Sequence, residues 1–226
     1  MDMVRTIVTP ANVMFMLQAA GRSLIIATFA LIFGNMLGII GASGRISKNK
    51  AAYTAATLYV ELIRGTPMLL QIYFLFLGLP AISRAITGVP LNLNVMLLGI
   101  IAMSINSGAY STELFRAGIQ SIDRGQWEAS KSLGLNYIST MRFVILPQAV
   151  KRIIPPMVSE YVTLIKDSSL IGVVGAIELL QSTRIIGTRH YNFIVPLLMA
   201  SVMYLVMTLT ISKFAKKLER KLAVSD

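Results

Sequence analysis

The segment from Ser23 to Gly44 contains no charged residue and lies between Arg22 and Arg45. Its length is about the 20 residues that an apolar helix needs to cross roughly 30 Å of hydrocarbon. A second uncharged run of similar length, from Tyr191 to Ser212, precedes a basic tail. A backbone inside a bilayer must satisfy its own polar groups, and a helix does so within one segment. These runs therefore predict an integral membrane protein.

The composition agrees with this prediction. The chain is 55% hydrophobic and only 14% charged, whereas soluble domains carry about 25% charged residues. The formal charge of +11 does not indicate a nucleic-acid partner, because the cations lie between apolar runs; a lipid bilayer is the expected surrounding. The chain has no cysteine, and its single histidine, His190, lies in a predicted external loop. We therefore expect no metal site.

We predict an all-α integral membrane protein forming a single domain over residues 1–226. Five transmembrane helices are expected, approximately at residues 23–44, 56–79, 95–115, 153–165 and 191–212. In the first span, Gly34, Gly38 and Gly41 recur at helical spacing, which is typical of a face that packs closely on another helix.

The predicted bounds depend on prolines and polar residues. The second span belongs to a longer apolar run, Ala51–Leu79, that is interrupted at Gly65-Thr66-Pro67. Residues 80–94, rich in Pro and Asn, are predicted to form an external loop. Pro155-Pro156 is expected to open the fourth span, because proline is tolerated in the first turn of a helix. The chain is then expected to turn after Lys166-Asp167 and form a further helical piece at Ala176–Thr183.

The distribution of cations predicts the orientation. About two thirds of the 21 Lys and Arg residues lie in the loop after the first span, in residues 116–152 and in the C-terminal tail. Loops rich in Lys and Arg stay in the cytoplasm. We therefore expect an external N-terminus, a cytoplasmic C-terminus and a cytoplasmic loop at residues 116–152.

That cytoplasmic loop contains a charged, helix-forming island. Glu128–Leu133 is predicted to form a short helix that Gly134 ends in a left-handed or bent conformation. Tyr137–Phe143 is predicted to form a second short helix that closes before Pro147. The result would be a helix-turn-helix on the membrane surface.

The same island carries a family resemblance. The order Glu-Ala-Ser-x-x-x-Gly, nine further residues and Val-x-Leu-Pro resembles the EAA loop of ABC-importer permeases, with Ser130 where a second Ala is usual and Val144 where Ile is usual. The resemblance implies a fold like that of type I ABC importers, with a coupling helix that docks on a cytoplasmic ABC ATPase dimer. The ATPase-coupling residues that it implies are Glu128, Ala129, Ser130, Leu133, Gly134, Leu146 and Pro147.

Three other stretches look like the polar amino-acid branch of these permeases, the histidine, glutamine and arginine type. They are Tyr59–Pro67 with Gln71, Asn106–Tyr110 with Glu113 and Arg116–Ile119, and Lys166–Leu170. The branch often has Asn where this chain has Ser159. The resemblance implies an amino-acid substrate, an extracytoplasmic amino-acid-binding protein, a second permease copy or a paralogue, and the bacterial cytoplasmic (inner) membrane. It implies no cofactor in this chain, with ATP and Mg²⁺ on the partner ATPase.

Polar residues inside the spans indicate the transport pathway. An intramembrane charge costs about 2.5 to 3.5 kcal/mol or more, so such groups should face protein or a wet cavity. Asn106, Tyr110 and Glu113 share one helical face, and Glu160, Thr163 or Leu164, and Asp167 share another. The substrate-pathway candidates are Asn106, Tyr110, Glu160, Thr163, Leu164 and Arg64.

Structural roles compete with these assignments. Glu61 with Arg64, and Glu113 with Arg116, stand at i and i+3 with opposite charges, so structural ion pairs are favoured for both. Glu160 suits either substrate contact or a bond to a neighbouring span.

Other functional classes are less consistent with the residues. No His-Glu-x-x-His or Gly-x-Ser-x-Gly motif indicates an enzyme, and a passive channel would not need a docking helix. The chain has no Gly-x-x-x-x-Gly-Lys-Ser/Thr loop, so ATP hydrolysis by that mechanism must reside on another polypeptide. The residues do not indicate which amino acid is carried.

Overall fold

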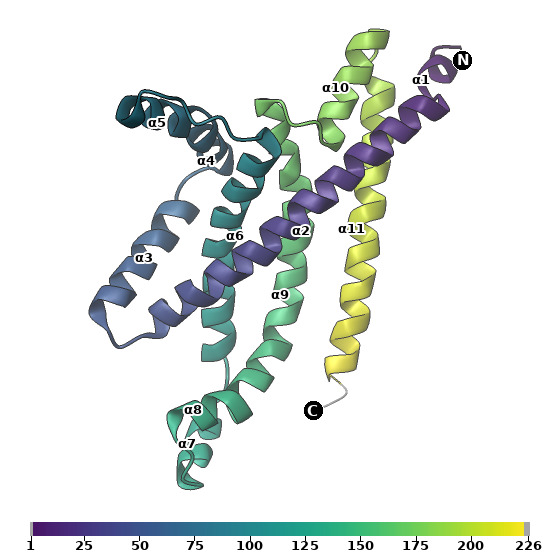
Figure 1. Ribbon diagram of the computed structural model, residues 1–226. Coiled ribbons are helices and arrows are strands. Elements are labelled where there is room, and N and C mark those ends of the chain that lie inside the picture. Colours follow the sequence, from purple (N-terminus) through teal and green to yellow (C-terminus); the bar gives the residue numbers. More distant parts are fainter. Residues whose placement is uncertain (1, 224–226) are drawn as a thin grey trace.

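A computed structural model describes residues 2–223, which are helical almost throughout and contain no strand. The helices are α1 (Asp2–Ile7), α2 (Pro10–Ile46), α3 (Lys50–Arg64), α4 (Met68–Tyr73), α5 (Leu79–Thr87), α6 (Val95–Gln120), α7 (Arg124–Ser132), α8 (Tyr137–Thr140), α9 (Leu146–Asp167), α10 (Leu179–His190) and α11 (Ile194–Ala223). The π turns η1 (Phe74–Gly78) and η2 (Met141–Ile145) and the 3₁₀ turn η3 (Ser168–Val174) join some of them. In Figure 1 the long helix α2 crosses α6, α9 and α11 obliquely.

Four helical segments among the described residues are long and apolar enough to cross a membrane: Pro10–Ile46, Met68–Thr87, Val95–Gln120 and Ile194–Lys217. A fifth arises if the pair Tyr137–Val174 and Leu179–His190, bent by 49°, counts as one broken span. The predicted fold class, an all-α membrane protein with about five spans, is confirmed.

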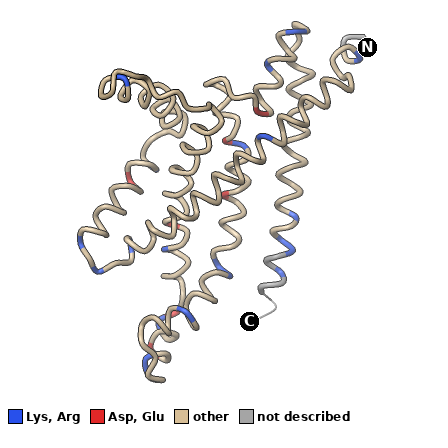
Figure 2. The backbone as a smooth tube through the Cα atoms, in the orientation of Figure 1, with Lys and Arg blue, Asp and Glu red and all other residues tan. Residues whose placement is uncertain are grey.

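The two ends of the bundle differ in charge. Figure 1 places α7, α8 and the last turns of α11 at one end, and α1, α5 and α10 at the other. In Figure 2, Lys and Arg cluster around α7 and along the ends of α9 and α11 that lie nearest to it. The end with α7 is called the coupling end below.

Helix α2 begins well before the predicted start of the first span, residue 23. Thr9 caps it by accepting a hydrogen bond from the Asn12 backbone N–H (3.2 Å), and Pro10 occupies the first turn. Arg22 lies inside the helix and donates to the Ile177 carbonyl (3.3 Å). Because a long side chain can carry its charge to a polar partner, Arg22 did not end the helix, and the uncharged run marked only part of it.

The predicted second span, residues 56–79, is displaced. Its first half belongs to α3, in which only Val60 is buried, and the chain breaks at residues 65–67 as the sequence predicts. The apolar segment long enough to span the membrane starts at Met68. The predicted external loop is wrong up to Thr87, since the chain stays helical until Gly88 ends α5 at a φ of 77°.

Two π turns explain why proline did not end these helices. The Leu79 N–H bonds to the Phe74 carbonyl just before Pro80, and the Leu146 N–H bonds to the Met141 carbonyl just before Pro147. A proline ring clashes with the carbonyl four residues earlier, and a bond to the fifth residue widens the helix at that place. The predicted helix stop before Pro147 is therefore wrong.

The fourth span also starts earlier than predicted. Helix α9 begins at Leu146, so Pro155 and Pro156 lie inside it and do not open it at residue 153. Its last turn runs into η3 and then into α10, which starts at Leu179. The predicted helical piece at Ala176–Thr183 corresponds to the start of α10, which continues to His190.

Helices α2 and α6 pack most closely in the bundle. Gly34, Gly38 and Gly41 are all buried and face Ser107, Ser111 and Thr112 of α6. A Cβ on Gly41 would overlap the Thr112 Oγ1. The Ser111 hydroxyl also donates to the Asn35 Oδ1 (2.9 Å). The predicted small-residue face is confirmed, and it lets two backbones approach.

The core lies where α2, α6, α9 and η3 meet. Ile26, Met103, Leu164 and Ile171 are almost fully buried there. Many other large apolar side chains along α2 and α11 are exposed, as expected for helices whose outer faces contact lipid.

Candidate translocation cavity and coupling loop

A polar cavity of about 530 Å³ lies between the break after α3 and the helices α6 and α9. Its lining residues are Arg64, Gly65, Thr66, Pro67 and Met68 from the break, Asn106 and Tyr110 from α6, and Glu160, Thr163 and Asp167 from α9. All predicted pathway residues except Leu164 lie in this lining. Leu164 is 1% exposed and packs in the core, so of the two alternatives Thr163 faces the cavity.

The cavity holds one cation, Arg64. Its guanidinium lies over the Tyr110 ring, 5.1 Å from the ring centroid, a distance typical of a cation–π contact. The predicted ion pair between Glu61 and Arg64 is wrong, because the ion pairs in the described part of the chain all involve Glu113. The Arg64 charge therefore remains available to the cavity.

Two carboxylates face the same cavity. Glu160 and Asp167 are two turns apart on one face of α9. Neither forms an ion pair with another described residue. A charged side chain within a membrane-spanning helix costs free energy unless water or a ligand solvates it. The lining thus offers two negative groups and one positive group to whatever occupies the space.

Gln71 braces the broken helix beside the cavity. Its Nε2 donates to the Ile63 carbonyl (2.8 Å) and the Thr66 carbonyl (3.1 Å), and its Oε1 accepts from the Asn106 Nδ2 (3.0 Å). The break at Gly65-Thr66-Pro67 was predicted from the sequence, whereas Gln71 was noted only as part of the family resemblance. The signal that could have found this role is a Gln one turn after a helix-breaking proline.

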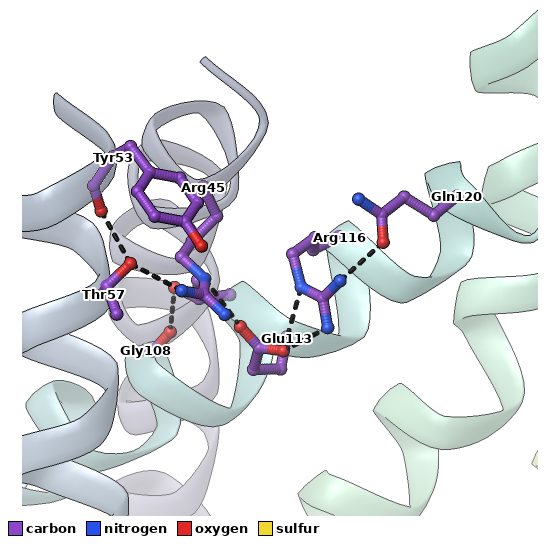
Figure 3. Close-up of polar contacts among 8 residues, drawn as sticks. Arg45, Tyr53, Thr57, Gly108, Glu113, Arg116 and Gln120 are labelled. Atoms are coloured by element: carbon purple, nitrogen blue, oxygen red, sulfur yellow. Dashed lines mark hydrogen bonds and ion pairs between the residues drawn. The ribbon is translucent and has the colours of Figure 1, made fainter. Parts of the chain in front are cut away.

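Glu113 lies on the same helix as Asn106 and Tyr110 but turns to a different site, shown in Figure 3. Its carboxylate pairs with Arg45 (3.2 Å) and with Arg116 (2.6 Å). Arg45 also donates to the Thr57 hydroxyl (2.5 Å). The predicted Glu113–Arg116 ion pair is confirmed, and the cluster ties α2, α3 and α6 together.

A larger cavity, about 580 Å³, lies between the last turns of α2 and α6 and the first turns of α9. Its lining is almost entirely apolar, with Ile39, Phe115, Met141 and Ile153 among the residues. It offers no charged group to a polar solute, so it is not the candidate pathway.

The coupling loop has the predicted short helix and turn. Asp123 caps α7 by accepting from the Gly125 N–H (2.7 Å). At the other end, the Leu135 N–H bonds to the Ser130 carbonyl (3.0 Å) and the Gly134 N–H bonds to the Lys131 carbonyl (2.9 Å), which is a Schellman motif. Gly134 has a φ of 76°, so its predicted left-handed conformation is confirmed.

The predicted coupling residues do not all face outward. Glu128, Ala129 and Leu133 are exposed, Leu133 by 81%. Ser130 is 3% exposed and donates to the Gln126 carbonyl (2.7 Å). Ser130 therefore supports the helix from inside and cannot offer its side chain to a partner. Leu146 and Pro147 lie farther on, in the first turn of α9, and are exposed.

The coupling loop is packed onto the start of α9. The Trp127 ring stacks on Tyr137 with centroids 6.0 Å apart. Ile122, Ile145 and Ile153 form a buried cluster against which Trp127 packs. Trp127 of α7 thus contacts residues at the start of α9, the helix that also carries Glu160.

These features define a class: a membrane-spanning transporter subunit, with a polar cavity at a broken helix and a short exposed helix, α7, at one end of the bundle. The chain belongs to the family of inner membrane components of binding-protein-dependent transport systems, which matches residues 34–224.

Among its relatives, a putative glutamine transport system permease protein GlnP of Rickettsia conorii is 35% identical over 95% of both chains. The arginine transport system permease protein ArtQ of Bacillus subtilis is 34% identical over 96% of this chain and 97% of its own. A crystal structure of an amino acid ABC transporter with histidines has a chain that is 34% identical, with a TM-score of 0.86, over 92% of this chain and 94% of its own. The MetNI methionine ABC transporter, 19% identical with a TM-score of 0.77, shares the fold.

The predicted resemblance to ABC-importer permeases of the amino-acid branch is confirmed. The chain is a membrane-embedded permease subunit of an ABC importer with a type I fold, and it forms the translocation pathway. Its relatives are permease subunits, not enzymes, and ATP hydrolysis belongs to a separate subunit.

Proposed function

We propose that this permease imports amino acids and that the cavity lined by Arg64, Asn106, Glu160 and Asp167 is where the substrate passes. The observation that carries the proposal is the placement of one guanidinium and two carboxylates around a single space of about 530 Å³. That volume and that set of charges suit a small zwitterion.

The chemistry of the lining assigns a role to each charge. Arg64 can bind the α-carboxylate with its planar guanidinium. Glu160 or Asp167 can accept from an ammonium group, and the second carboxylate suits a cationic side chain. The lining has one more negative than positive group, so it favours amino acids with a net positive charge. The relative named for arginine transport supports a cationic substrate, whereas the relative named for glutamine transport supports only the broader class of amino acids.

We further propose the partners and the orientation. The coupling end faces the cytoplasm, where α7 docks on an ABC ATPase dimer that holds ATP and Mg²⁺. The opposite end, with the N-terminus, receives substrate from an amino-acid-binding protein outside the bacterial cytoplasmic (inner) membrane, and the C-terminus is cytoplasmic. Two features support this: the exposed Glu128 and Leu133 on the docking helix, and the cations gathered at that end. A second permease copy or a paralogue completes the pathway.

The test replaces Glu160 by Gln, which keeps the shape and removes the charge. The permease–ATPase complex in lipid nanodiscs is titrated with L-arginine and with L-glutamine, without the binding protein. We expect the affinity for L-arginine to fall about tenfold, as for one charge-assisted hydrogen bond, and that for L-glutamine to change much less.

Glu61→Gln is the matched control, because Glu61 is exposed and lies outside the cavity lining; it should leave both affinities unchanged. Equal affinity of the Glu160→Gln and wild-type complexes for L-arginine would remove Glu160 from the pathway. Loss of assembly with the ATPase would instead assign Glu160 a structural role.

A further inference from the structure

Gln71 lies on α4 outside the cavity lining, yet its contacts determine what one cavity residue can offer. The carbonyl of Ile63, in the last turn of α3, would bond to the N–H of residue 67 in a continuous helix. Residue 67 is proline and has no N–H. The Gln71 Nε2 takes its place at 2.8 Å, and it also donates to the Thr66 carbonyl at 3.1 Å.

These contacts fix the direction of the Gln71 amide. Backbone carbonyls only accept hydrogen bonds, so the atom that faces them must be the amide nitrogen. The Gln71 Oε1 then points away from the break, toward Asn106. Since an oxygen cannot donate, the Asn106 Nδ2 must be the donor of the 3.0 Å bond between the two side chains.

Asn106 is 8% exposed and lines the cavity. With its Nδ2 held by Gln71, its Oδ1 is the acceptor that remains, and the described residues supply no donor to it. Asn106 stands one turn before Tyr110, on whose ring Arg64 lies. In an amino acid, the carboxylate and the ammonium share one carbon, and Arg64 and Asn106 line the same cavity, so one substrate could present its carboxylate to Arg64 and its ammonium to Asn106.

We propose that Gln71 is a positioning residue that locks the amide of Asn106, so that its Oδ1 accepts a hydrogen bond from the α-ammonium group of the substrate. The proposal rests on the proposed function of the cavity. The break at Pro67 then also affects specificity. The Ile63 carbonyl, which the proline leaves without its helical partner, fixes the orientation of the Gln71 amide by a hydrogen bond, and that orientation makes the cavity specific for an α-amino group.

The test measures discrimination rather than affinity. L-Arginine and 5-guanidinopentanoate, which is arginine without its α-amino group, compete for radiolabelled L-arginine on the permease–ATPase complex in nanodiscs. The ratio of the two inhibition constants is compared between wild type, Gln71→Leu and Gln71→Glu. Leu fills a similar space without polar atoms, whereas Glu keeps an acceptor for the Asn106 Nδ2.

The ratio is the inhibition constant of 5-guanidinopentanoate divided by that of L-arginine, so a high value means strong preference for the α-amino group. We expect Gln71→Leu to lower this ratio about threefold to tenfold, which corresponds to the loss of one oriented hydrogen bond. Gln71→Glu should keep or raise it, even though it loses both bonds to the break. A residue that only braces the helix would weaken both ligands alike in both variants and leave the ratio unchanged, and that result would overturn the proposal.

Asn106→Asp provides a second test that does not depend on how well Gln71→Leu folds. If the Gln71 amide cannot rotate, the carboxylate of Asn106→Asp would lie against the Gln71 Oε1, and the two oxygens would repel each other. L-Arginine binding should then weaken, although a negative charge has been added to the cavity lining. Tighter binding by Asn106→Asp would overturn the proposal. No amino-acid binding by the wild-type complex would overturn the proposed function and this inference together. Binding that depends on Glu160 with an unchanged ratio in Gln71→Leu would overturn this inference alone.

Discussion

The left-handed turn at Gly134 gives the sharpest test of the coupling loop. Gly134 has a φ of 76°, and no atom lies within 4 Å of the place that a Cβ would take, so a larger residue would meet backbone strain but no clash. A side chain in this region costs about 1 to 2 kcal/mol, and a β-branched residue lies at the upper end of that range. Gly134→Val should therefore disfavour the turn that ends α7 with the bonds to Ser130 and Lys131.

If docking requires this turn and the free loop of the variant relaxes out of it, the cost of restoring the turn is added to the binding free energy. An increase of about 1 to 2 kcal/mol corresponds to about fivefold to thirtyfold weaker affinity for the ATPase. The rest of the loop should stay in place, because the Trp127–Tyr137 stack and the buried cluster around Ile145 do not involve Gly134. The assay is equilibrium binding of the purified ATPase to the permease in nanodiscs, with substrate-stimulated ATP hydrolysis as a second readout.

Two variants control for strain and for size. Gly134→Asn should bind almost as wild type, since Asn tolerates the left-handed region. Gly88→Val imposes the same strain at a φ of 77°, also with nothing within 4 Å, but at the end of α5, away from the coupling end. It should leave the affinity unchanged. Wild-type affinity of Gly134→Val, or an equal loss in Gly88→Val, would refute the reasoning.

Two further predictions concern stability. Gly41→Ala should destabilise the bundle by about 1 to 3 kcal/mol, as overpacking does, and lower its melting temperature in detergent. Gly21→Ala is the control, because nothing lies within 4 Å of its added Cβ. Thr112→Ala, combined with Gly41→Ala, should rescue part of the loss. An unchanged melting temperature would contradict the close contact of α2 with α6. Glu113→Gln should lower the free energy of unfolding by about 1 to 3 kcal/mol, because it leaves Arg45 and Arg116 half-buried without their shared carboxylate. Glu61→Gln is the matched control. Equal melting temperatures of the two variants would show that the cluster contributes nothing to stability.

Local patterns determined much of this protein. The two uncharged runs predicted the first and last of the spans, because the bilayer imposes a length on any apolar helix. Helical periodicity placed Asn106 with Tyr110, and Glu160 with Asp167, on shared faces, and the structure brings both faces to one cavity. Gly134 needed only its own sequence context to be predicted as left-handed.

Proline was the local signal that misled. Pro80 and Pro147 predicted ends of helices, but a π turn before each lets the helix continue. Pro155 and Pro156 lie within the continuous helix α9 and have no such turn before them, but neighbouring helices can stabilise a spanning helix despite lost bonds. A residue's own preference is worth a few kcal/mol, and packing along a whole helix exceeds it.

Contacts between distant residues were decided by the tertiary structure alone. Glu61 and Glu113 have the same spacing to an arginine, yet of the two only Glu113 forms an ion pair in the structure, with Arg116 of its own helix and with Arg45 of α2. Arg64 is drawn instead to the Tyr110 ring on α6. Ser130 lies in the docking motif but faces inward. The sequence determined which faces are polar, and the packing of α2, α3, α6 and α9 determined which polar groups meet, because those partners are far apart along the chain.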